Sequence, residues 1–278
     1  METLVNGFKS NRAFAITSIL VLVLLLIAVA APVLAPYDPT QATMKDAFLE
    51  PGAQHIFGTD KLGRDCFSRV LYGARASLSG VLFLVACVFT VGTTMGVLSG
   101  YFGGKVDTVI MRISDMMISF PGMILAIAVA GIMGGSLVNA VIALTIVSWT
   151  KYARLARSLV MKIKRRDFVD AAIVNGGSSS HILWVHILPN ILPMMVVTAA
   201  ADIGALMMEL AGLSFLGFGS QPPAPEWGLM LNEGRQQLQT APWLMIFPGL
   251  AIFVTVVIFN LWGDNLRDVL DPRNDAKE

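Results

Sequence analysis

Two acidic residues lie inside an otherwise apolar segment in the second half of the sequence. Asp202 and Glu209 are seven positions apart within MMVVTAAADIGALMMELAGLSF. Seven residues are close to two helical turns, so both carboxylates would lie on one face of a helix. A carboxylate inside an apolar helix is costly and normally faces a polar pathway or a charged partner. Two interpretations stay open: a path that favours cationic cargo, or pairing with basic residues of a second subunit.

The neighbouring sulfur and imidazole side chains give no clear metal-binding pattern. Met207 and Met208 lie beside Glu209, but methionine in a membrane helix more often fills space than binds a metal. His181 and His186 are five positions apart, which is poor spacing for one helical face. We therefore predict no metal site. The candidate lining residues of a path through the membrane are Asp202, Met207, Met208 and Glu209.

The chain has no recognisable nucleotide-binding or catalytic motif. The string nearest to a phosphate-binding loop, Gly100–Val106, has the wrong glycine spacing, and Val106 has no hydroxyl for magnesium. The two cysteines, Cys66 and Cys87, show no disulfide or metal spacing, and we interpret them as isolated thiols. We expect a protein that is not an enzyme, with no catalytic residue and no cofactor bound by this chain.

A polar loop rich in glycine and serine interrupts the apolar sequence between residues 170 and 189. It follows a strongly basic run and ends at Leu188-Pro189, where the next apolar segment begins. Gly176 allows a sharp turn, and the apolar residues Ile182–Trp184 would be costly in water unless another surface covers them. The loop predicts a docking element for a partner. A basic loop that interacts with anionic lipid headgroups is the alternative.

The spacing in this loop resembles the EAA motif of the permease subunits of ABC importers. That motif reads Glu-Ala-Ala, three residues, Gly, nine residues, Ile, one residue, Leu-Pro. Here Asp replaces the Glu and His replaces the Ile. The matching positions are Asp170, Ala171, Ala172, Gly176, His186, Leu188 and Pro189. The resemblance implies that these residues couple the chain to a cytoplasmic ATPase, which would bind ATP and magnesium.

Three further segments resemble the C-type permease of the dipeptide, oligopeptide and nickel importer family. Residues 58–75 match GTD-x-x-GRD-x-x-SR-x-x-x-G-x-R, and residues 259–272 match FNL-x-GD-x-LRD-x-LDP. Residues 214–228 match SFLGLG-x-QPP-x-P-x-WG, with Phe218 at the second leucine. The last segment would lie outside the membrane and meet a solute-binding protein, or form a lid over the pathway. Its candidate contact residues are Gln221, Pro222, Pro223 and Trp227.

The composition indicates that membrane helices position all of these residues. Only 14% of the 278 residues are charged and 55% are hydrophobic, whereas soluble domains carry about 25% charged residues. The first uncharged run, Ala13–Tyr37, has 25 residues, which is too long for the apolar core of a signal peptide and long enough for a retained membrane span. The net charge of +1 gives no indication of nucleic acid as a partner.

Uncharged runs predict an all-α integral membrane protein with six transmembrane helices, which the resemblance identifies with the type I permease fold of ABC importers. The run from Met116 to Thr150 has 35 residues, too many for one span of a hydrocarbon core about 30 Å thick. Gly131–Ser136 supply the break between a third helix, starting near Asp107, and a fourth. The second lies between residues 75 and 105, the fifth covers about 190–217, and the sixth about 243–262. We divide the chain into residues 1–75, with the first helix and an outer loop, and a core of residues 76–278, with a coupling loop at about 158–189.

The positive charges orient these helices. With the N-terminus in the cytoplasm, 14 Lys and Arg residues lie on the inner side and six on the outer side. An excess of Lys and Arg is typical of the cytoplasmic side of a membrane protein. Because six spans return the chain to the same side, both termini and the loop at residues 158–189 are expected in the cytoplasm of a bacterial cell.

The sequence therefore predicts a permease subunit of an ATP-driven importer in the bacterial cytoplasmic membrane. The resemblance implies three kinds of partner: a homologous permease subunit, two ATPase subunits and an extracytoplasmic solute-binding protein. Small peptides and nickel, bare or as a chelate, remain equal candidates for the cargo. A secondary transporter would show two similar halves with broken helices, and a membrane-embedded enzyme would have only Asp202 and Glu209 as a catalytic pair.

Overall fold

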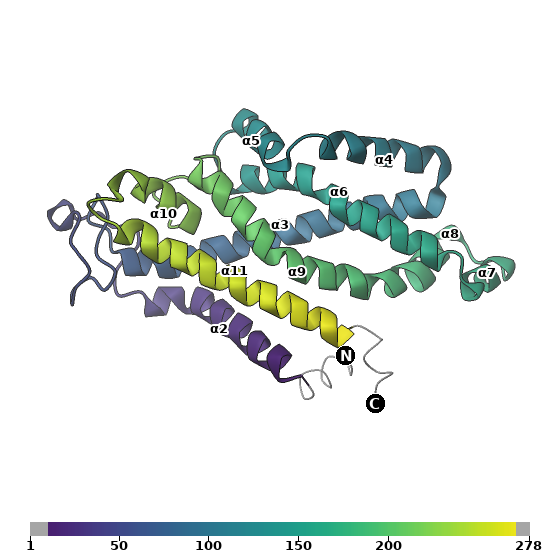
Figure 1. Ribbon diagram of the computed structural model, residues 1–278, viewed down its shortest axis with the longest axis horizontal. Coiled ribbons are helices and arrows are strands. Elements are labelled where there is room, and N and C mark those ends of the chain that lie inside the picture. The colour runs from purple at the N-terminus through teal and green to yellow at the C-terminus, as the bar shows by residue number, and fades with distance from the viewer. Residues whose placement is uncertain (1–10, 271–278) are drawn as a thin grey trace.

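The computed structural model describes residues 11–270, and in that range the chain is a bundle of helices without an extended sheet (Figure 1). This confirms the all-α prediction. The long helices are α2 (Arg12–Leu34), α3 (Cys66–Phe102), α4 (Gly104–Ile118), α5 (Gly122–Met133), α6 (Leu137–Ile163), α9 (Leu188–Phe215) and α11 (Trp243–Leu270). The short elements are α7 (Asp167–Val174), α8 (Ser179–His181), α10 (Trp227–Gly234), the π-helical segment η2 (Ile182–Ile187), and 3-10 turns at Met44–Asp46 and Arg235–Gln237.

Within residues 11–270, four helical segments are long and apolar enough to cross a membrane, namely α2, α3, the continuous run Ser179–Phe215 and α11. The pair α4 and α5 gives a fifth if its two helices are counted as one span. Helix α6 has 27 residues, or about 40 Å, but basic residues occupy its second half. With α6 included, the chain runs along the bundle six times (Figure 1). We name the two ends of the bundle the α7 end and the α10 end.

The third of these runs is not the single helix that the sequence analysis expected. Helix α4 stops at Ile118, α5 starts at Gly122, and the two axes differ by 95°. Pro121 lies at the break and disfavours a helical conformation for Phe120 before it. The composition stays apolar across the bend, so the uncharged run gave no sign of it. The break predicted at Gly131–Ser136 is confirmed, because α5 ends at Met133 and α6 begins at Leu137.

Three glycines allow α3 and α6 to pack with their backbones close together. Gly92, Gly96 and Gly100 recur every four residues along α3 and face α6. A Cβ atom on Gly96 would lie 2.3 Å from the backbone oxygen of Ala153, and one on Gly92 would lie 2.4 Å from Cβ of Tyr152. Small residues at this spacing are the usual means by which membrane helices pack without a hydrophobic driving force.

Helix α2 lies at the edge of the bundle, beside α3 and α11 (Figure 1). Its N-terminus is capped by Asn11, whose side-chain oxygen accepts a hydrogen bond from the backbone N–H of Phe14 at 3.1 Å. Helix α3 begins at Cys66 and runs unbroken through the expected boundary between residues 75 and 76. The N-terminal region and the core are therefore joined by a continuous helix.

The start of α9 is set by proline. Pro189 has no N–H to continue the helical ladder, and the wider π-helical turn η2 lies immediately before it. Farther along, α9 crosses α11 at Gly204, where a Cβ atom would lie 2.1 Å from Oδ1 of Asn260. This close crossing fixes the depth of Asp202 and of the next two turns of α9 in the bundle.

Candidate functional site

A cavity of about 330 Å³ lies at mid-length of α9, between α9, α6 and the bend that joins α4 to α5. Its lining residues are Met117, Ile118, Phe120, Gly122, Val147, Ser148, Thr150, Lys151, Tyr152, Asp202, Ala205, Leu206 and Glu209. Three of them, Lys151, Asp202 and Glu209, carry a charge at neutral pH. The structure thus places both acidic residues singled out in the sequence in one cavity, and it adds a cation to them.

Lys151 and Asp202 form an ion pair across this cavity. The ammonium Nζ of Lys151 donates to the two carboxylate oxygens of Asp202 at 2.6 and 2.8 Å. The side chain of Lys151 is 64% exposed, whereas that of Asp202 is 16% exposed. The pair joins α6 to α9, the two long helices that flank residues 164–187, so the predicted loop at about 158–189 overlaps the ends of both helices. Asp202 is therefore neutralised within its own chain.

Glu209 is differently placed. Its carboxylate is half-buried two turns farther along α9, and Oγ of Ser148 is 3.5 Å from Oε2. Among the described residues, no lysine, arginine or histidine lies within ion-pair distance of it. The cavity therefore contains one neutralised carboxylate and one that lacks a cation.

The two methionines of the predicted path lie elsewhere. Met207 is buried in the helix core at 2% exposure. Met208 is 55% exposed and lines an apolar groove of about 600 Å³ between α9 and α11. Within the described part of the chain, no three His, Cys, Asp or Glu residues are grouped so that they could hold a metal ion. The arrangement gives the cavity charged groups without a set of metal ligands.

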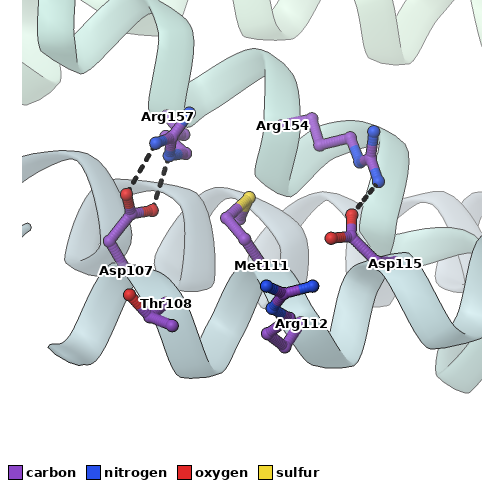
Figure 2. A pocket seen from close by; sticks show the side chains of 7 residues that line it. All are labelled: Asp107, Thr108, Met111, Arg112, Asp115, Arg154 and Arg157. Atoms are coloured by element: carbon purple, nitrogen blue, oxygen red, sulfur yellow. Dashed lines mark hydrogen bonds and ion pairs between the residues drawn. The ribbon is translucent and has the colours of Figure 1, made fainter. Parts of the chain in front are cut away.

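Two more ion pairs join α6 to α4 nearer the α7 end, around a pocket of about 510 Å³ (Figure 2). Arg157 contacts Asp107 through two bonds of 2.5 and 2.6 Å, and Arg154 contacts Asp115 at 2.5 Å. Arg112 also lines this pocket without meeting either carboxylate in Figure 2. With the ion pair of the cavity, three cations at three-residue steps along α6 each meet a carboxylate of a neighbouring helix. This series neutralises the cations of α6 from Lys151 to Arg157.

At the α7 end, hydrogen bonds explain the spacing between Ala172 and Gly176. The N–H of Gly177 donates to the carbonyl of Ala172, and the N–H of Gly176 donates to that of Ile173, both at 3.0 Å. Gly176 has φ of +81°. These features define the Schellman termination of a helix, which requires the left-handed conformation four residues beyond Ala172. The DAA-x-x-x-G pattern is therefore that of a helix end.

Helix α7 and the π-helical segment η2 carry exposed apolar side chains. Val174 is 86% exposed and Trp184 is 68% exposed, whereas Val169, Ile182 and Ile187 are buried and fix the element to the bundle. Exposed apolar surface of this kind marks an interaction site. Of the residues that match the EAA motif, Asp170, Ala171, Gly176 and Pro189 are exposed, and Ala172, His186 and Leu188 are half-buried.

At the α10 end, the segment of residues 58–75 forms a buried charge network with α10. Glu233 accepts from Arg64 at 2.9 Å and from Arg69 at 2.7 Å, each arginine meeting a different carboxylate oxygen. Asp60 contacts Arg64 at 2.5 Å and lies 3.7 Å from Arg69. Burial opposes the charge of Arg64, but the two carboxylates outweigh it and raise the pKa of its guanidinium. The network ties the N-terminal loop to α10.

The predicted contact residues for an external partner divide into two groups. Gln221, Pro222 and Pro223 are exposed. Trp227 is buried at 3% exposure, with its indole N–H donating to the carbonyl of Val70 at 2.9 Å. Its ring occupies the space beside Gly73, where a Cβ atom would lie 2.5 Å from it. In this structure Trp227 anchors α10 to α3, and the exposed surface is formed by the residues before it.

Sequence reasoning missed Lys151 and Glu233. Lys151 was counted among the cytoplasmic charges, because an uncharged run ends where the first cation appears. A detectable signal was the three-residue spacing of Lys151, Arg154 and Arg157, since cations along a helix that enters a membrane need carboxylate partners. For Glu233 no sequence pattern indicated that it pairs with residues more than 160 positions away. The last residues of the 259–272 motif lie outside the described residues.

Comparison with known proteins agrees with these features. Residues 92–275 match the family of inner membrane components of binding-protein-dependent transport systems, and residues 5–51 match the N-terminal transmembrane domain of oligopeptide transport permease C.

Similar proteins include the dipeptide transport system permease protein DppC of Alkalihalophilus pseudofirmus, which is 43% identical over 95% of this chain and 87% of its own. The nickel transport system permease protein NikC of Escherichia coli (strain K12) is 41% identical over 96% of this chain and 97% of its own. The glutathione transport system permease protein GsiD of Pectobacterium atrosepticum is 47% identical over 90% of this chain and 84% of its own.

A solved structure of the MetNI methionine ABC transporter in an inward-facing conformation has the same fold. Its TM-score is 0.60 at 20% identity, and the match covers 73% of this chain and 97% of that chain. The family match and the three relatives settle the classification. The chain belongs to the family of inner membrane permease components of binding-protein-dependent ABC importers.

Proposed function

We propose that this chain imports small peptides or nickel, as the bare ion or a chelate, together with ATPase subunits that dock at its α7 end. Relatives named for dipeptide, nickel and glutathione transport support this range of cargo. The observation that carries the docking is the exposed apolar surface of α7 and η2, held in place by the Schellman turn at Gly176. We place the α7 end and both termini in the cytoplasm of a bacterial cell, because the excess of Lys and Arg lies there.

The complete importer would contain this chain, a homologous permease subunit, two cytoplasmic ATPase subunits that carry ATP and Mg²⁺, and an extracytoplasmic solute-binding protein. The binding protein would meet the exposed residues Gln221, Pro222 and Pro223 at the α10 end. ATP binds the two states of such an assembly with different affinity, so its binding and hydrolysis shift the population between outward-facing and inward-facing forms. Helices α6 and α9 would transmit the motion, since they flank the docking element.

The path for cargo would pass the cavity at Asp202 and Glu209. Polar and charged groups inside a membrane bundle are expected along a water-filled route, and the position of these two carboxylates in one cavity supports this path. Met208 faces the separate groove between α9 and α11, and Met207 lies behind Glu209 in the core. We therefore assign the contact with cargo to the charged residues of this cavity and a packing role to Met207.

Substitution of Gly176 tests the docking. A Cβ atom at this position would meet nothing within 4 Å, but φ of +81° strains a tryptophan, so Gly176→Trp distorts the turn as well as adding bulk to the docking surface. We expect Gly176→Trp to remove the ATPase subunits from the purified complex and to abolish ATP-dependent uptake. Gly176→Asn is the matched control, because asparagine tolerates the left-handed conformation and should retain both. An intact complex and normal uptake with Gly176→Trp would overturn the docking assignment.

A further inference from the structure

The cavity at mid-length of α9 holds charges of both signs, and they are arranged along the path. The Lys151–Asp202 pair lies on the side of the α7 end, and Glu209 lies two turns nearer the α10 end. Seven residues of helix separate the two carboxylates by about 10 Å. One end of the cavity therefore presents an ammonium group and the other presents a carboxylate without a cation.

The charged groups at both ends of the cavity are free to form a further hydrogen bond with a ligand. Lys151 is 64% exposed on a flexible stem, and its ammonium has a third donor beyond the two directed at Asp202. Within the described residues, the carboxylate of Glu209 has one hydrogen bond, 3.5 Å from a serine hydroxyl. Both groups can therefore form a further charge-assisted hydrogen bond without losing the contacts that they already have.

This arrangement does not suit a bare divalent cation. Such an ion needs several oxygen, nitrogen or sulfur ligands around one point, whereas the cavity offers one carboxylate without a cation, and no group of three metal-binding residues lies in the described part of the chain. A molecule with a positive and a negative end satisfies both Lys151 and Glu209, and an extended dipeptide is about 7 Å long.

We propose that Lys151 and Glu209 are specificity-determining residues that read the two ends of a zwitterionic cargo, with the carboxylate of the cargo toward Lys151 and its ammonium toward Glu209. This rests on the proposed function, since it assigns the cargo of the same importer. It narrows the cargo to short peptides with free termini and removes bare nickel. Lys151 then has two roles: it neutralises Asp202 in the empty cavity and is shared with cargo when the cavity is filled.

The test uses the complete importer in proteoliposomes and four cargoes: a dipeptide with free termini, its C-terminal amide, its N-acetyl form, and Ni²⁺. Each uptake rate is divided by the fraction of that cargo held by the solute-binding protein. Lys151→Gln should lower uptake of the free dipeptide about 10-fold, as expected for loss of a charged hydrogen bond, and change that of the amide less than about 2-fold. Glu209→Gln should also lower uptake of the free dipeptide about 10-fold. It should change uptake of the N-acetyl form, which has no ammonium, less than about 2-fold.

Lys151→Arg should restore uptake of the free dipeptide, because it keeps the charge. Lys45→Gln and Glu50→Gln, which remove the same charges from exposed positions in the N-terminal loop, should have no effect. An equal fall for all three peptides, or no fall, overturns the specificity role. Transport of Ni²⁺ in place of peptides by the unaltered importer also overturns it, and either result leaves the proposed function standing. An unaltered complex that neither hydrolyses ATP nor moves any cargo would instead remove the proposed function.

Discussion

Glu233 is the residue on which the buried charges of the α10 end converge. Arg64 and Arg69 are 1% exposed each and share its two carboxylate oxygens. Removing one partner of a buried ion pair leaves a charge without compensation, which costs more than the intact pair contributes. Here a single carboxylate serves two cations from a distant part of the chain. Its loss should therefore separate the N-terminal loop from α10.

We expect Glu233→Gln to lower the free energy of unfolding by about 3 kcal/mol. The amide keeps the shape of the side chain but carries no charge, so Asp60 alone remains to neutralise Arg64 and Arg69. Thermal unfolding of the purified protein in detergent measures the change. Glu50→Gln is the control, because Glu50 is exposed in the same loop. Equal melting temperatures for the two variants would show that the network adds nothing to stability.

At the scale of the elements, the position and length of the apolar helices were predictable from the sequence, but the direction that the chain takes at a bend was not. Uncharged runs located the long helices, and Gly131, Gly134 and Gly135 located the turn between α5 and α6. The 95° bend at Pro121 was missed, because a search for charges marks the ends of an apolar run but not a break within it; the available signal was the dipeptide Pro121-Gly122. The candidate site was predictable as far as Asp202 and Glu209, which share a face of α9. Lys151, which lies beside them, belongs to α6. The length of an apolar run does not show which helices pack against each other, so this neighbour was not predictable.

The register between α3 and α6 depends on glycine, and Gly96→Ala tests it. A Cβ atom at Gly96 would lie 2.3 Å from the backbone oxygen of Ala153, so the helices must separate and the variant should lose about 1–3 kcal/mol of stability. Gly249→Ala in α11 is the control, since the nearest atom to its Cβ would be at 3.9 Å. Unfolding in detergent compares them. A Gly96→Ala protein as stable as the Gly249→Ala protein would mean that the two helices pack less closely than described.

On the scale of the whole molecule, the six runs place opposite kinds of surface at the two ends. The α7 end presents exposed apolar side chains beside a basic loop, whereas the α10 end is closed by buried ion pairs and the anchored ring of Trp227. The order of the runs was predictable from the sequence, because each long apolar segment must cross to the other side. The contacts that close the α10 end were not, since they join residues 60–75 to residues 226–233.

Orientation in the membrane follows from the distribution of charge, with 14 Lys and Arg residues assigned to one side and six to the other. Single cysteines test it. Trp184→Cys, exposed at the α7 end, should react with a membrane-impermeant maleimide in inside-out vesicles alone, and Gln221→Cys, exposed at the α10 end, in right-side-out vesicles alone. Native Cys66 is buried, and Cys87 can be replaced by serine as background. The reverse pattern of labelling would place α7 outside the cell, where no ATPase could reach it, and would end the docking proposal along with the orientation.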